Sequence, residues 1–112
     1  METITKMLNA FEQAASKYSE ATIEGNARVA NRSFDKVEKI VSYLKENNSL
    51  DGLRMFLKHD VIGVRMLAAS YLLSKYEKEA SYVLEEISNG KGMIPFIAEM
   101  TLKEWRKGHL ND

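Results

Sequence analysis

Residues 60–69 read Asp-Val-Ile-Gly-Val-Arg-Met-Leu-Ala-Ala, and this stretch decides the fold. Asp60 stands where the free amides of a first helical turn need an acceptor, and its charge opposes the positive end of the helix dipole. We therefore predict that Asp60 is an N-cap. The small pair Ala68 and Ala69 allows a neighbouring helix to approach closely. The stretch thus predicts a helix that packs tightly against others.

The rest of the chain repeats apolar residues with a period near 3.6, which indicates helices throughout. Gly25 is expected to end the first helix and Asn26 to cap the second, and the single proline, Pro95, falls in a first helical turn where it costs little. Helices are expected over about 4–23, 27–46, 49–58, 61–75, 77–88 and 93–107. We expect one all-α domain over residues 1–112, a short α-solenoid of about three antiparallel helix pairs, divided into a helix pair at 3–47, a repeat at 49–75 and a repeat at 77–107.

A shift of 30 residues superposes the last four predicted helices in pairs. The superposed apolar positions are Leu50 and Ala80, Leu53 and Val83, Leu57 and Ile87, Val64 and Ile94, Leu67 and Ile97, Ala68 and Ala98, and Leu72 and Leu102. Arg65 falls on Pro95 and Asp60 on Gly90, so the polar pair occurs once. This is expected if the second unit is terminal and has no further neighbour.

The whole chain resembles a small bacterial family of HEAT-like helical-repeat domains of unknown function. The residues that carry the resemblance are Gly25-Asn26, Ala30-Asn31-Arg32, Leu44, Val64-Arg65, Ala68-Ala69, Ala98, Leu102, Trp105 and Gly108. The resemblance implies the HEAT-like fold, in which an Asp and an Arg at the places of Asp60 and Arg65 join successive repeats. It implies no activity, because fold does not fix function. Some families of this size and shape are immunity proteins that neutralise bacterial toxins.

Composition narrows the classes of function. The 112 residues include 16 basic and 16 acidic ones, balanced seven against seven over 1–48 and nine against nine over 49–112, so a net basic surface for nucleic acid is absent. There is no cysteine, which removes disulfides, thiolate chemistry and the usual zinc sites. No phosphate loop, nucleophile elbow or HExxH motif occurs, and we expect neither a cofactor nor a metal. The start of the chain fits neither a signal peptide nor a membrane span, so a cytoplasmic protein is expected.

A polar ridge opens the second predicted helix, formed by Arg28, Asn31, Arg32 and Asp35. One interpretation is a contact for an anion or a partner near a helix N-terminus. The other is a solvated face with ion pairs within the helix, which is the normal complement of an apolar stripe.

Other polar residues also have two interpretations. His59 stands at a helix end, where cations are favoured, and neither it nor His109 has a metal-type partner three or four residues away. Glu85 and Glu86 are adjacent and diverge on a helix, so they do not form a catalytic pair. Trp105 among basic residues resembles the start of a single-strand-binding surface, or it covers the end of the stack.

The expected function is a non-enzymatic protein-interaction module, in its sharpest version a toxin-neutralising protein of the immunity type. The predicted partner-binding residues are Arg28, Asn31, Arg32, Asp35, Arg65, Tyr71 and Trp105, and the predicted structural residues are Asp60, Ala68 and Ala69. The alternative is a HEAT-like nucleic-acid-binding protein or DNA-repair enzyme, which the neutral charge disfavours. Homo-oligomerisation is a third expectation, because short solenoids leave their end surfaces bare.

Overall fold

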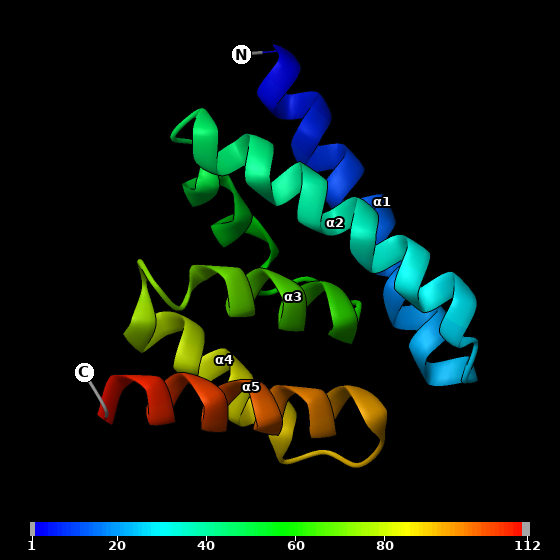
Figure 1. Cartoon of the computed structure of the whole chain (residues 1–112), viewed down its shortest axis with the longest axis vertical. Helices are drawn as coiled ribbons and strands as arrows, with labels where there is room; N and C mark the ends of the chain where they lie inside the picture. Colours follow the sequence, from blue (N-terminus) through cyan, green and yellow to red (C-terminus); the bar gives the residue numbers. More distant parts are fainter. Residues whose placement is uncertain (1, 111–112) are drawn as a thin grey trace.

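Six helices and no strand form the described part of the computed structural model, residues 2–110 (Figure 1). They are α1 (Glu2–Glu24), α2 (Ala27–Glu46), the 3₁₀ helix η1 (Leu50–Phe56), α3 (Ile62–Leu72), α4 (Glu77–Ser88) and α5 (Met93–Leu110). Side chains are described from residue 3 to residue 108, so that of His109 lies outside the described part. The all-helical prediction is confirmed over these residues. No helix among them is both long and apolar enough to cross a bilayer.

The turn between α1 and α2 follows directly from two residues. Gly25 has φ +77°, a left-handed conformation that glycine adopts without strain, and the Asn26 amide donates to the Ala21 carbonyl at 2.8 Å. The Asn26 side chain accepts a hydrogen bond from the Val29 amide at 3.2 Å, so the predicted N-cap of the second helix is confirmed. The helix α2 then returns along α1 (Figure 1).

The helix α3 is the centre of the fold and packs against α1, η1, α4 and α5. Figure 1 shows it between the α1 and α2 pair and the α4 and α5 pair. Its first-turn Val64 and its last-turn Leu72 are both fully buried in the core. This short helix therefore joins the two outer pairs into one core, in a molecule that measures 36 × 35 × 23 Å.

The prediction that Asp60 caps α3 is wrong. The N-cap is Val61, and its side chain makes no capping hydrogen bond, while Asp60 is exposed. The Gly63 amide donates instead to Ser19 Oγ of α1 at 3.1 Å, and the Val61 amide donates to His59 Nδ1 at 3.0 Å. These two side chains supply the acceptors that the sequence assigned to Asp60, and one of them comes from another helix.

The positions that a 30-residue shift superposes have similar burial, but the helices that contain them differ in type. Five of the seven superposed pairs have both members buried, and in the other two Val83 and Ile97 are half-buried. The element η1 is a seven-residue 3₁₀ helix, however, whereas its counterpart α4 is an α-helix of 12 residues. In addition, α3 ends at Leu72 rather than near Lys75, and α5 continues beyond Gly108 to Leu110. The two-repeat organisation stays a prediction.

Ala68 provides a test of the close packing around α3. It has no exposed surface and lies within the core. Replacing it with leucine adds three carbon atoms to a filled site, so Ala68→Leu is expected to destabilise the fold by about 1–3 kcal/mol. Ala27→Leu is the matched control, because Ala27 is exposed at the start of α2. Thermal unfolding compares the two, and equal melting temperatures would contradict the close approach.

Candidate functional site

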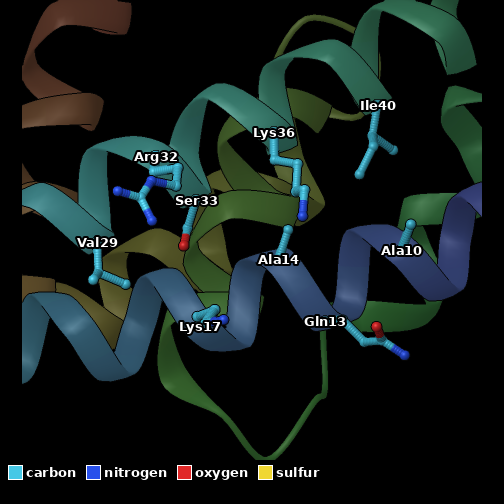
Figure 2. Close-up of a pocket in the computed structure, with 9 residues that line it drawn as sticks. All are labelled: Ala10, Gln13, Ala14, Lys17, Val29, Arg32, Ser33, Lys36 and Ile40. Atoms are coloured by element: carbon cyan, nitrogen blue, oxygen red, sulfur yellow. The ribbon is translucent and has the colours of Figure 1, made fainter.

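A groove runs between α1 and α2, with a volume of about 510 Å³. On each helix the lining residues are one, three or four positions apart, so each helix contributes a single face to the groove. The lining residues are Ala10, Gln13, Ala14 and Lys17 from α1, and Val29, Arg32, Ser33, Lys36 and Ile40 from α2 (Figure 2). We call this cavity the α1–α2 groove.

Small side chains at the helix contact create the hollow. Ala14 on α1 lies across from Ser33 on α2, which is almost fully buried, and Ala10 lies below Ile40 (Figure 2). Val29 and Ile40 lie at the two ends of the α2 side. The floor is therefore mainly apolar, with a single hydroxyl group.

The rim of the groove is cationic. Lys17, Arg32 and Lys36 are exposed, and the lining contains no acidic residue. Among the residues that the structure describes, none of these three cations forms an ion pair. The groove thus presents three positive charges that no acidic side chain of the described residues pairs with.

The row of cations on α2 extends one turn beyond the groove. Arg28, Arg32 and Lys36 are four residues apart, so they lie along one side of the helix over about 12 Å. The first turn of α2 contains no acidic residue, and Arg28 stands there instead, at the positive end of the helix dipole. Asp35 is exposed on the same helix but makes no ion pair among the described residues. The arrangement therefore places a row of positive charge along this side of α2.

The seven predicted partner-binding residues do not form one surface. Arg28, Asn31, Arg32 and Asp35 are exposed on α2, and of these four Arg32 lines the groove. The remaining three, Arg65, Tyr71 and Trp105, lie elsewhere and are each held by other parts of the chain.

Arg65 holds the connection between η1 and α3. Its Nη1 donates to the carbonyl oxygens of His59 at 2.6 Å and Asp60 at 3.3 Å. A guanidinium that binds two carbonyl groups of the preceding loop fixes the entry into α3. The structure thus gives Arg65 a bracing contact within the chain.

Tyr71 and Trp105 are each tied to a carboxylate on another helix. The Tyr71 hydroxyl donates to Glu38 Oε2 of α2 at 2.6 Å, and burial together with this carboxylate raises the pKa of Tyr71. Trp105 is half-buried, and its Nε1 donates to Glu77 Oε2 of α4 at 2.8 Å. Both side chains connect helices.

His59 has a partner for each ring nitrogen. Nδ1 accepts from the Val61 amide, and Nε2 lies 2.7 Å from Glu12 Oε2 on α1. Because Nδ1 is an acceptor, the ring proton is on Nε2 and is donated to the Glu12 carboxylate. His59 therefore links the η1–α3 connection to α1. Over residues 2–110, no cluster of acidic or histidine side chains has a geometry that would hold a metal ion.

No family model, curated protein or solved structure matches this chain.

Two parts of the protein surface were not predicted from the sequence. Lys17 and Lys36 complete the rim of the α1–α2 groove. The position of Lys36, four residues after Arg32, is the sequence signal that points to it, whereas no such signal points to Lys17. A second hollow, of about 840 Å³, lies between η1 and α4 beside exposed Met55 and Tyr82. Exposed apolar residues do not differ in composition from core residues, so no pattern in the sequence separated these two from the core.

Proposed function

We propose that the protein is a non-enzymatic protein-interaction module, and that its partner places an acidic segment in the α1–α2 groove. The observation that supports this proposal is the cationic rim of Lys17, Arg32 and Lys36 above an apolar floor, without an acidic residue in the lining. An acidic segment that also bears small apolar side chains complements both properties of the groove.

The rim is unfavourable for the isolated protein. Like charges four residues apart on a helix destabilise it by about 0.2–0.5 kcal/mol per pair, and α2 contains two such pairs, Arg28 with Arg32 and Arg32 with Lys36. Arg28 adds an unfavourable interaction with the helix dipole. A partner that supplies carboxylates relieves this repulsion, so part of the binding free energy comes from the charges of the groove.

A protein partner fits the groove better than a nucleic acid. Nucleic-acid affinity depends on many phosphate contacts, and single strands also need aromatic side chains on which bases stack. The lining offers three cations and no aromatic residue. Sixteen acidic residues balance the 16 basic ones, so a long phosphate backbone would also meet repulsive surface.

The lining also lacks the groups that acid-base and nucleophilic catalysis use. The hydroxyl group in the lining belongs to Ser33, and the lining contains no histidine or carboxylate that would accept a proton from this hydroxyl group. This supports a binding role for the groove.

We also propose that η1 with α3 and α4 with α5 are two units of a short HEAT-like stack. The matched burial of the positions superposed by the 30-residue shift supports this arrangement.

The experiment begins with co-purification from the native host and mass spectrometry, followed by titration of the identified partner. Arg32→Glu and Lys36→Glu are each expected to weaken binding about tenfold, because reversing a charge at a complementary interface converts attraction into repulsion. Lys39→Glu is the matched control, since Lys39 is exposed on the same helix but does not line the groove. Its affinity is expected to stay within about twofold of the parent.

Circular dichroism should show the same helical content for all three variants. If Lys36→Glu and Lys39→Glu weakened the affinity equally, the partner would bind outside the α1–α2 groove. Submicromolar binding of DNA or RNA at physiological salt, or turnover of a nucleic-acid substrate, would favour the alternative of a HEAT-like nucleic-acid enzyme. If the partner is a toxin, binding should also inhibit it, and the same charge reversals should restore its activity.

A further inference from the structure

An apolar patch lies where the end of α1 meets the start of α5. Ile23 is 65% exposed, and Met93 and Phe96 are each 55% exposed. Two adjoining hollows, of about 360 and 350 Å³, share Ile23 as a lining residue. Figure 1 shows the end of α1 and the start of α5 on the same side of the molecule. Large apolar side chains that are exposed together mark an interaction surface.

The two hollows carry opposite charge. The first is lined by Glu20 and Glu24 and contains no cation, whereas the second is lined by Lys91 and contains no acidic residue. Among the described residues, none of these three charges forms an ion pair. The patch is therefore acidic on one side of Ile23 and basic on the other.

The helix ends reinforce this asymmetry. Glu24 ends α1 and Glu20 lies one turn before it, near the negative end of the helix dipole, and the last turn of α1 contains no basic residue. Lys91 precedes α5, whose first turn is positive and has no acidic residue. Neither helix end thus has, within its own turn, a side-chain charge that would balance its dipole.

We propose that a second copy of this chain covers the patch in a twofold dimer. A twofold axis that passes beside Ile23 brings the acidic side of one copy onto the basic side of the other. Ile23 then meets Ile23, and Glu20 and Glu24 face Lys91 of the second copy at two equivalent places. A partner with a uniformly charged surface would oppose one half of the patch, whereas a second copy complements both halves.

This surface is separate from the α1–α2 groove. On α1 the groove is lined by residues up to Lys17, while the patch begins at Glu20 and Ile23, about one turn further along the helix, and the hollows have no lining residue in common. Dimerisation therefore does not depend on the proposed function, and the two are tested by different residues.

Sedimentation velocity of the full chain over a range of concentrations tests the dimer. We expect a reversible equilibrium between monomer and dimer with a Kd of roughly 1–100 µM, in the range of small interfaces. Ile23→Ser should raise this Kd at least about tenfold, because it removes the apolar centre of the patch. Met55→Ser is the matched control, since Met55 is 68% exposed on η1, away from the patch, and should leave the Kd unchanged.

Charge exchange tests the orientation of the two copies. Lys91→Glu and Glu24→Lys should each raise the Kd about fivefold or more, because each change creates two repulsive contacts in a symmetric dimer. An equal mixture of the two variants should associate more tightly than either variant alone, since each contact then joins opposite charges. A chain that stays monomeric at millimolar concentration would overturn the proposal. A dimer that is indifferent to Ile23→Ser, or whose two charge variants do not rescue each other, would overturn it as well.

Discussion

Gly63→Ala is expected to destabilise the protein by about 2–3 kcal/mol, although glycine to alanine normally stabilises a helix. A Cβ on Gly63 would lie 2.3 Å from Ser19 Cβ, 2.5 Å from Ser19 Oγ and 2.9 Å from Ser19 Cα. The last of these atoms belongs to the backbone of α1, so a side-chain rotation does not relieve the contact. The helices α1 and α3 must therefore separate, and the bond from the Gly63 amide to Ser19 Oγ is lost. Chemical denaturation measures the change in free energy of unfolding.

Gly108→Ala is the matched control for this change. Gly108 lies within α5, and a Cβ there would meet no atom within 4 Å. Alanine should therefore stabilise the protein by about 0.5–1 kcal/mol at this position. Opposite signs for the two glycines are the expected result. A Gly63→Ala variant as stable as the parent would mean that α1 and α3 do not approach each other as closely as the structure shows.

Phe11→Ala is expected to cost about 3–5 kcal/mol, the range for removing a buried aromatic ring. Phe11 is fully buried on α1, and its ring stacks on Phe56 of η1 with centroids 5.4 Å apart. Phe56 in turn lies edge-on to His59 at 6.1 Å. Removing the first ring leaves a cavity between α1 and η1, so the melting temperature should fall by about 10 °C or more.

Phe96→Ala is the control for the loss of an aromatic ring, because Phe96 is mainly exposed on α5. At a concentration well below the Kd of the proposed dimer, its effect should stay within about 0.5–1 kcal/mol. Comparable losses for Phe11 and Phe96 would contradict the assignment of Phe11 to the core.

The sequence was sufficient to predict those features of the fold that a residue and its near neighbours in the chain determine. Gly25 ends α1 and Asn26 caps α2 because a left-handed turn and a side-chain cap are completed within a few residues. The period of apolar residues likewise predicts six helices. It does not distinguish the 3₁₀ geometry of η1 from an α-helix, since Leu50, Leu53 and Phe56 fit both periods.

Contacts between distant residues could not be predicted. Asp60 satisfies the local rule for an N-cap, but Ser19 Oγ, 44 residues away, binds the amide. On the α2 side of the candidate site Arg32 was predicted from its helical spacing to Arg28, whereas Lys36 was not. The α1 half depends on the angle at which two helices meet, so Lys17 could not be assigned to the groove.

The capping of α3 by Ser19 affects how the chain folds. The central helix lacks a side-chain cap of its own, so its first turn becomes complete when α1 has docked and brought the hydroxyl group to the Gly63 amide. In a stack of independent repeats, folding can start in any unit and spread to its neighbours. In this chain the acceptor of the Gly63 amide comes from α1, so we expect the first turn of α3 to form together with the docking of α1. The protein should consequently unfold as a single cooperative unit despite the repeat-like spacing of its last four helices.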